Sequence, residues 1–401
     1  MRRLWVLLAL LTIAVCYSPM ILTYVLSATC LIAVALMLYK KFIRKNKESL
    51  AALFLSVLLN QIALICRTLR YLNFVSDVES LRAPNYMTLL LKPHPEVTYE
   101  RMQIKDDTIN MMIYRPKVIK NDGLIVYAHG GGWVMFTARM FHSAVSWIAH
   151  ECQMVTISVD YRRPPEHPFP TPLLDVHYTV LWAQLNAQKL GIDASKVVLM
   201  GDSSGGNLAA AATTLHRDDK ELDKHSFPAI RAQVLIYPVL QSYNYSYGSY
   251  IEKDLTNLRK YVSYYIAGDL SLNNKAGDPA QYKGVPAYWS AVVDTSVTGK
   301  DLAVKRSLES SPDNLDNVYA FPLLDDDPNG LPPTFVLALT RDAIRDDGEH
   351  YAKWLEYSGV RVKYVEESQA NHGFMFLYGT DECALSYLKS LAKFVWQNVE
   401  E

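Results

Sequence analysis

The sequence predicts an α/β protein in which a mostly parallel central sheet carries helices on both faces, with a membrane segment at the N-terminus. Two observations predict the sheet. From Val97 onward, short β-type runs alternate with helical stretches, and glycine-rich turns directly follow two of these runs. Strand–helix alternation is typical of parallel sheets, because each parallel connection needs a crossover. A third observation predicts the separate segment, since the first 48 residues differ in composition from the rest.

The N-terminal segment, residues 1–48, is predicted to be a membrane anchor. Leu4–Leu38 carries no charge and is interrupted by Ser18-Pro19. A helix of that length would run about 52 Å, longer than a hydrocarbon core of about 30 Å. Met20–Leu38 is long enough for one span, and the part before the proline is a signal-like segment, a tilted extension or half of a hairpin. The basic residues within 40–47 are expected on the cytosolic side.

Residues 49–96 are predicted to form a cap or a membrane-associated helical region. The apolar run Ser49–Cys66 contains Asn60 and Gln61 near its middle. It forms either a second span, which would return the chain to the lumen, or a helix over a pocket or on the bilayer surface. The cost of placing two amides in hydrocarbon favours the second interpretation. Topology therefore stays open at this point.

Residues 97–401 form the predicted α/β domain, and its elements follow from local patterns. The first two strands alternate in polarity and are joined by Asp106-Asp107, which predicts a hairpin. Gly191 and Gly359 each follow a helical pattern and are expected to end it. The expected strands are Val97–Gln103, Ile109–Tyr114, Leu124–Ala128, Met154–Val159, Val197–Met200, Val234–Val239, Thr334–Leu339 and Val360–Val365, and the expected helices are Ala138–Cys152, Pro172–Leu190, Asn207–His216, Asp347–Ser358 and Ala384–Val399.

The stretch from about 240 to 331 interrupts the alternation and is predicted to be a helical cap insertion. A structureless loop of that length would be unusual. Its tyrosines either line a pocket or pack at the surface as amphipathic rings. They are Tyr243, Tyr245, Tyr247, Tyr250, Tyr261, Tyr264, Tyr265, Tyr282 and Tyr288. The triplet beginning at Asn244 is a glycosylation candidate, which favours a lumenal face.

Composition and charge exclude several classes of function. Half of the residues are hydrophobic and 20% are charged, so the chain can bury a large core. The formal net charge of −1 leaves no basic excess for phosphates, so we expect no nucleic-acid partner. The five cysteines show no C-x-x-C spacing, so we expect no metal site. Cys152 and Cys383 would pair only if the fold brought them together, and no pattern indicates a cofactor or an obligate protein partner.

The sequence GDSSGG at 201–206 follows an apolar run and fits the pattern G-x-S-x-G, with Ser203 at its centre. This pattern holds a nucleophilic serine on a sharp strand-to-helix turn. Gly201 and Gly205 are expected because a Cβ at either position would collide with the turn. We therefore predict that Ser203 attacks and that Ser204 contributes its backbone N–H. On this view Ser204→Ala keeps most activity and Ser203→Ala abolishes it.

The sequence HGGGW at 129–133 also follows an apolar run and is an oxyanion-loop pattern. Attack of a hydroxyl on a carbonyl needs donors aimed at the oxygen that becomes negative. Glycines let the backbone approach a ligand closely. We therefore predict an oxyanion hole built from Gly130, Gly131, Gly132 and the N–H of Ser204.

A serine hydroxyl also needs a base, and an acid to orient that base. Chain order Ser, acid, His is typical of this serine turn. His372 in the ANHGF stretch follows the last predicted strand, and Asp342 follows the strand Thr334–Leu339. Asp346 and Asp347 are expected instead to cap the next helix or to complement its dipole.

Five motifs in order carry a family resemblance over about residues 97–401. They are HGGGW, YRRPPEHPFP at 161–170, GDSSGGNLAAA, RDAIRDDGEHYAKWLEYSGV from 341, and NHGF from 371. The chain resembles the hormone-sensitive-lipase family of α/β-hydrolases, and most of all its arylacetamide deacetylase and neutral cholesterol ester hydrolase branch. The resemblance implies an α/β-hydrolase fold with a helical cap and a triad matched by Ser203, Asp342 and His372.

The resemblance also implies hydrolysis of carboxylic esters or arylamides without metal or cofactor, lipophilic ester or amide substrates, and contact with membrane lipid. It implies anchoring in the endoplasmic reticulum with a lumenal catalytic domain. The alternative is a catalytically weak or inactive small-molecule or lipid receptor on the same fold; receptors that resemble this family lack the histidine that this chain keeps. The chain departs from the family at Ser204, where alanine is usual, and at Arg163, for which Glu166 is the expected partner.

Overall fold

The computed structural model describes residues 70, 75–82, 92–219, 227–251, 253–282, 284–286, 288–289, 292, 305–311, 314–368, 370–377 and 382–400. The chain divides into two compact units, residues 1–84 and residues 85–401. The predicted anchor at 1–48 lies outside the described residues, as does most of the predicted region 49–96. None of the helices in the described ranges is both long and apolar enough to cross a bilayer. The domain boundaries at 48 and 96 therefore stay predictions.

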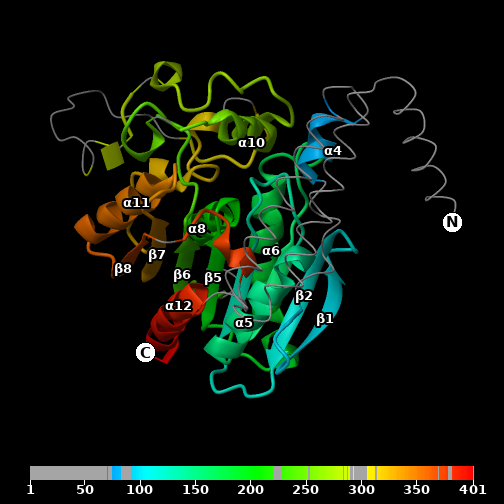
Figure 1. Cartoon of the computed structure of the whole chain (residues 1–401). Helices are drawn as coiled ribbons and strands as arrows, with labels where there is room; N and C mark the ends of the chain where they lie inside the picture. Colours follow the sequence, from blue (N-terminus) through cyan, green and yellow to red (C-terminus); the bar gives the residue numbers. More distant parts are fainter. Residues whose placement is uncertain are drawn as a thin grey trace, which may run out of the picture. The chain divides into compact units, whose positions relative to one another are not determined.

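The second unit alternates strands and helices as predicted (Figure 1). Its strands are β1 Val97–Ile104, β2 Ile109–Pro116, β3 Leu124–Ala128, β4 Val155–Asp160, β5 Val197–Asp202, β6 Ala232–Ile236, β7 Thr334–Leu339 and β8 Val362–Glu367. Its α-helices are α5 His142–Cys152, α6 Thr171–Leu185, α7 Ala187–Leu190, α8 Ser204–Asp218, α10 Thr256–Ala267, α11 Arg345–Tyr357 and α12 Glu382–Glu400. The short 3-10 helices are η2 Ala138–Phe141, η3 Gly248–Tyr250, η4 Pro279–Gln281, η6 Asn314–Asp316, η7 Pro322–Leu324 and η8 Phe374–Leu377, and the first unit contains α4 Asp77–Arg82.

The eight strands form one sheet in the order β1-β2-β4-β3-β5-β6-β7-β8. β1 pairs antiparallel with β2, and β2 antiparallel with β4. Every pairing from β4 through β3 to β8 is parallel. The predicted hairpin is confirmed, and its turn places Asp106 and Asp107 at φ 51° and 62°. The mostly parallel sheet is confirmed as well.

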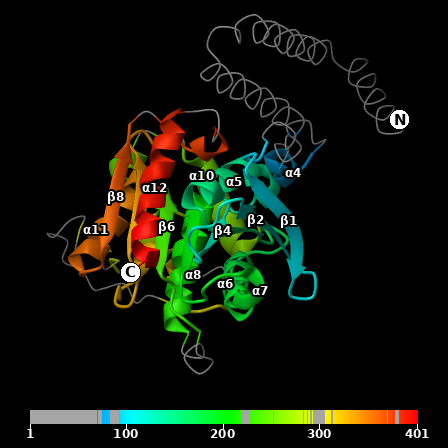
Figure 2. The same cartoon turned by 90° about the horizontal axis from the view of Figure 1, so that it is seen from below.

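Helices cover both faces of the sheet, and each face has its own core. One core packs α6, α8 and α11 against alternate strand side chains, including Val126, Leu199 and Val336. The other packs α5 and α12 against the residues between them, such as Val198 and Leu337. Figure 2 shows α12 beside α5, seen from below. Because strand side chains alternate between faces, a strand covered on both sides is buried along its whole length and mostly apolar, as β3, β5, β6 and β7 are.

Several boundaries differ from the predicted ones for local reasons. The predicted helix 172–190 is interrupted at Asn186, whose side-chain amide donates to the Trp182 carbonyl at 2.8 Å and competes with the helix. β6 ends at Ile236 rather than Val239, because Tyr237 has φ 35° and Pro238 has no N–H to donate. β8 begins two residues later than predicted, since the Val360 N–H still bonds to α11 at the Leu355 carbonyl.

The chain between β6 and β7 departs from the sheet and carries α10 (Figure 1). Its tyrosines are mostly buried rather than at the surface; Tyr245, Tyr250, Tyr265 and Tyr288 are each less than 5% exposed. Tyr261 on α10 lines a cavity at the carboxyl ends of the parallel strands, next to Ser203. Ligands of open α/β sheets bind at this end of the strands.

Candidate active site

Ser203 occupies a strained turn between β5 and α8. It has φ 54° and ψ −122°, a conformation that residues with side chains rarely adopt. The turn is crowded on both sides. A Cβ at Gly201 would lie 2.2 Å from the Gly205 carbonyl oxygen, and a Cβ at Gly205 would lie 2.1 Å from the Ala128 oxygen. The predicted steric reason for these two glycines is therefore confirmed.

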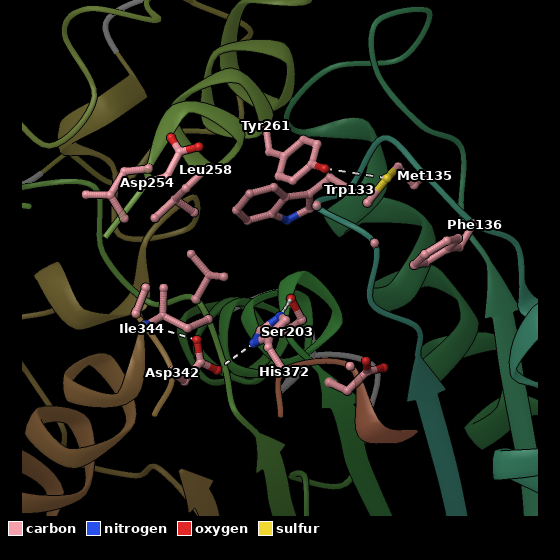
Figure 3. A pocket seen from close by; sticks show the side chains of 17 residues that line it. Trp133, Met135, Phe136, Ser203, Asp254, Leu258, Tyr261, Asp342, Ile344 and His372 are labelled. Atoms are coloured by element: carbon pink, nitrogen blue, oxygen red, sulfur yellow. Dashed lines mark hydrogen bonds and ion pairs between the residues drawn. The ribbon is translucent and has the colours of Figure 1, made fainter. Parts of the chain in front are cut away.

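The structure brings the Ser203, His372 and Asp342 side chains together (Figure 3). The Ser203 Oγ lies 2.9 Å from His372 Nε2, and His372 Nδ1 lies 2.5 Å from Asp342 Oδ2. A carboxylate only accepts hydrogen bonds, so Nδ1 carries the imidazole proton and Nε2 is free to accept the Ser203 proton. Three residues from three different connections thus form one continuous hydrogen-bond relay.

The electrostatics of this relay favour a protonated imidazole. Burial opposes the charge on His372, but the charge of Asp342 and its hydrogen bond, aided by the charge of Asp202, outweigh burial and raise the pKa of His372. The imidazole itself keeps 40% of its surface open to the cavity. An imidazole that gains a proton readily, within reach of a hydroxyl, is suited to general base catalysis.

The backbone of residues 130–133 lies against the serine turn, but not all of its N–H groups are free. The Gly130 N–H donates to Asp202 Oδ1 at 2.8 Å, so the expectation that Gly130 serves as an oxyanion donor is wrong. A Cβ at Gly130 would lie 2.5 Å from Asp202 Oδ2, so this glycine provides room for the carboxylate. Within the described part of the chain, no acceptor faces the N–H groups of Gly131, Gly132 and Ser204. These three remain the candidate oxyanion donors.

A cavity of about 280 Å³ opens over the relay and is mostly apolar. Its floor holds Ser203 and His372, and its roof holds Leu258 and Tyr261 of α10 (Figure 3). The remaining lining residues are Gly131, Gly132, Trp133, Met135, Phe136, Asp202, Val239, Asp254, Leu255, Asp342, Ala343, Ile344 and Gly373. A mostly apolar pocket with a few convergent polar groups is typical of a small-molecule site.

Two buried carboxylates beside the site were not predicted to act there. Asp202 accepts the Tyr127 hydroxyl at 2.7 Å as well as the Gly130 N–H, and burial raises its pKa. Asp347 accepts the N–H groups of Leu240 and Gln241, at 2.8 and 3.3 Å. A role for Asp202 could have been predicted from the sequence, because this residue belongs to the GDSSGG motif. The partners of Asp347 depend on tertiary contacts and could not.

Asp346 and Asp347 were expected either to cap α11 or to complement its dipole, and the structure supports the second role. Both lie in the first turn of α11, where negative charge complements the helix dipole. Neither caps the helix, whose N-cap residue Ile344 makes no side-chain bond. Instead Asp346 Oδ2 accepts the Ser249 N–H at 2.7 Å, so both carboxylates tie α11 to the segment that follows β6.

The structure describes the surroundings of three residues singled out in the sequence. Arg163 pairs with Asp160 at 3.5 Å and donates to the Phe136 carbonyl, and its expected pairing with Glu166 stays a prediction. Asn244 is half-buried, and its side-chain oxygen accepts the Ser246 N–H at 2.8 Å. Cys152 is a buried free thiol, and the Cys383 side chain lies outside what the structure describes.

Comparison with known proteins identifies consistent relatives. The Abhydrolase_3 model, described as the alpha/beta hydrolase fold, matches residues 125–294 and 293–376. Arylacetamide deacetylase of Bos taurus is 31% identical over 316 residues, which cover 71% of this chain and 77% of the relative. Neutral cholesterol ester hydrolase 1 of Bos taurus is 33% identical over 278 residues, covering 63% and 67%.

Solved structures share the same architecture. A hyperthermophilic esterase from the archaeon Pyrobaculum calidifontis superimposes with a TM-score of 0.58 at 26% identity. The match covers 83% of this chain and 97% of that chain. The similarity therefore extends over most of this chain and nearly all of that esterase.

Proposed function

Because this chain belongs to the hormone-sensitive-lipase family of α/β-hydrolases, we propose that it is a serine hydrolase of carboxylic esters. Ser203 is the nucleophile, His372 the general base and Asp342 the group that orients the histidine. The observation that carries the proposal is the unbroken relay from Ser203 Oγ through the imidazole to Asp342, at 2.9 and 2.5 Å.

The proposed reaction proceeds through an acyl-enzyme. His372 Nε2 takes the Ser203 proton as Oγ attacks the ester carbonyl, and the oxygen that becomes negative accepts the N–H groups of Gly131, Gly132 and Ser204. The imidazolium then gives its proton to the departing alcohol, which leaves Ser203 acylated. Water, deprotonated by His372, then attacks the acyl carbon. The bond from that carbon to Ser203 Oγ breaks, the imidazolium returns the proton to Oγ, and the acid is released. Asp342 holds the imidazole in its orientation and stabilises the imidazolium.

The proposed substrates are esters with lipophilic acyl or aryl groups, and arylamides or lipid esters are further members of this class. The apolar side chains of Met135, Leu258 and Ile344 around Ser203 support this choice. Burying one methylene of a substrate is worth about 0.8 kcal/mol, so each added carbon that fits the cavity should lower KM. Substrate acyl groups larger than the cavity volume of about 280 Å³ need either a movement of α10 or an exit through the opening of the cavity.

We further propose that the protein is anchored in the endoplasmic reticulum membrane by residues 1–48, with the catalytic domain in the lumen. The charge-free run Leu4–Leu38 and the basic residues that follow it support the anchor. Microsomes that contain the full chain test this proposal. We expect the chain to stay in the membrane during carbonate extraction. We also expect that glycosidase treatment shifts its electrophoretic mobility and that this shift is absent in Asn244→Gln. Complete extraction would refute the anchor, and an unglycosylated chain digested by added protease would refute the lumenal side.

A fluorophosphonate probe and p-nitrophenyl esters of increasing acyl length test the proposed chemistry. We expect the wild-type protein to be labelled and to hydrolyse the esters, Ser203→Ala to do neither, and His372→Gln to lose hydrolysis by several orders of magnitude. Ser146→Ala serves as the matched control, since it removes a buried serine hydroxyl that does not line the cavity. A wild-type protein that neither reacts with the probe nor hydrolyses any ester would instead support the receptor alternative.

A further inference from the structure

Two hydrogen bonds fasten the loop that carries the oxyanion donors to the turn that carries the nucleophile. Asp202 and Ser204 flank Ser203, and Gly130 and Trp133 flank the donor pair Gly131-Gly132. The first bond joins the Gly130 N–H to Asp202 Oδ1 at 2.8 Å. The second joins the Trp133 N–H to Ser204 Oγ at 3.0 Å. The residue on each side of Ser203 is thus hydrogen-bonded to a residue beside the Gly131-Gly132 pair.

From this arrangement we infer that Ser204 is a positioning residue whose hydroxyl holds the oxyanion loop in place, an inference that rests on the proposed function. The sequence motif predicted only a backbone N–H role for Ser204 and a dispensable side chain. The side chain is fully buried and accepts one of the loop's main-chain N–H groups. Without the hydroxyl, the Trp133 N–H would be a buried donor with no partner, which is a costly arrangement that the loop would relieve by moving.

The loop depends on such bonds because its own backbone is not regular. Gly132 and Trp133 are consecutive residues with φ 57° and 60°, and they belong to neither a helix nor a strand. A non-glycine residue in this conformation persists only where its surroundings hold it. The Trp133 indole is also held, since Nε1 donates to Asn207 Oδ1 at 3.3 Å and the ring stacks on Tyr265 at 4.4 Å.

The start of the same loop is held by a separate bond. The Tyr161 hydroxyl donates to the His129 carbonyl at 2.8 Å. The bond from the Trp133 N–H to Ser204 Oγ holds the other end of the loop, and an alanine at position 204 would lack the oxygen that accepts it.

The expected effect is on the transition state rather than on substrate binding. The oxyanion forms only after Ser203 has attacked, so a displaced Gly131-Gly132 pair lowers kcat and leaves KM nearly unchanged. Removing one oxyanion donor outright costs about 100-fold or more in kcat. Ser204→Ala displaces donors without deleting them, so we expect a loss in kcat of about tenfold.

The test uses Ser204→Ala and a matched control that deletes the same kind of bond elsewhere. Ser146 is also fully buried, and its hydroxyl accepts the His94 N–H at 2.8 Å and donates to the Ser143 carbonyl at 2.7 Å. It does not line the cavity. Ser146→Ala therefore leaves the N–H of a buried residue, His94, without this partner, and His94 is far along the chain from the oxyanion loop.

Two readouts separate positioning from a general structural role. The first is kcat and KM for a short p-nitrophenyl ester. The second is the inhibition constant of an aryl trifluoromethyl ketone, which forms a tetrahedral adduct with a negatively charged oxygen, compared with that of the corresponding methyl ketone. For Ser204→Ala we expect kcat to fall about tenfold, KM to stay constant, and the trifluoromethyl ketone constant to rise by the same factor. The methyl ketone constant should not change, and Ser146→Ala should match wild type in all readouts.

Several outcomes would overturn the inference. Wild-type kcat and trifluoromethyl ketone inhibition in Ser204→Ala would do so, as would a fall in kcat with an unchanged inhibition constant. An equal loss in Ser146→Ala would show that lost stability, not positioning, is responsible. If Ser204→Ala fails to fold, Ser204→Cys keeps the size but offers a weak acceptor, and it should show a smaller change in the same direction. A wild-type protein that hydrolyses no ester refutes the proposed function itself, and this inference fails with it.

Discussion

The buried carboxylate of Asp347 makes a strong prediction about stability and pH. Asp347 is only 1% exposed, and burial raises its pKa to about 7, against an ordinary value of about 4. Three donors oppose this rise, namely the N–H groups of Leu240 and Gln241 and the Tyr250 hydroxyl. They reduce the effect of burial without cancelling it, so the folded protein holds a proton on Asp347 that the unfolded chain releases more readily.

The sign and size follow from linkage. Between about pH 4 and pH 7 the folded state binds more protons at this site than the unfolded state, so the free energy of unfolding falls as pH rises. One pKa unit corresponds to about 1.4 kcal/mol, so the whole rise corresponds to at most about 4 kcal/mol. This contribution is fully present below about pH 4, and most of it has been lost by pH 7.

Asp347→Asn removes the titration but keeps an oxygen that can accept the N–H groups of Leu240 and Gln241. The assay is urea unfolding of wild type and variant from about pH 4.5 to pH 8. We expect the wild-type free energy of unfolding, minus that of the variant, to decrease by 2 to 4 kcal/mol, on the order set by the linkage relation, as pH rises across this range. In Tyr250→Phe, which loses one of the donors that favour the ionised form, the same decrease should move to higher pH. A difference between wild type and Asp347→Asn that does not vary with pH would refute this reasoning.

Three further predictions concern the site itself. The pKa of His372 is raised, so kcat/KM should increase with pH through an inflection above the ordinary imidazole value of about 6.5. Asp342→Asn should lower both the pH of this inflection and the rate. An inflection that this variant leaves unchanged would count against the pairing of Asp342 with His372. Gly132→Ala places a Cβ 2.5 Å from the Tyr261 ring at a residue with a left-handed φ, so ester hydrolysis should fall about 100-fold. The double variant with Tyr261→Ala should recover only the part of this loss that is due to the clash with the ring. Full activity in Gly132→Ala would contradict the observed loop. Gly205→Ala puts a Cβ 2.1 Å from a backbone oxygen of β3, so the variant should be recovered in much lower soluble yield than wild type, and a normal yield with normal activity would exclude this crowding.

The local patterns of the sequence predicted most of the α/β domain. Strand-type runs separated by helical periods predicted each of the eight strands. The motif at 129–133 follows β3, and the motif at 201–206 begins with the last two residues of β5, so that Ser203 directly follows that strand. Local errors occurred where a side chain or a proline interrupts a regular pattern, as at Asn186 and Pro238. The family was also evident from its motifs, and the relatives found for the chain confirm it.

The candidate site was predictable to the extent that each residue follows a strand. Ser203, Asp342 and His372 lie after β5, β7 and β8, and the carboxyl ends of neighbouring parallel strands meet at one edge of the sheet. The order of the three residues along the chain then selects His372 among ten histidines. What that reasoning did not reach was the direction of single N–H groups, such as that of Gly130, which points to Asp202 instead of the cavity.

The sequence by itself determined the fold class, the turn that bears Ser203 and the identity of the three relay residues. These depend on periodicity, on steric limits at glycine and on chain order, all of which are properties of short segments or of their succession. Only the tertiary structure decided that Ser204 holds the Trp133 N–H, 71 residues away, and that Asp347 holds the Leu240 N–H, 107 residues away. A buried polar group bonds to whichever partner packing brings within about 3 Å, and that partner leaves no periodic trace in the sequence.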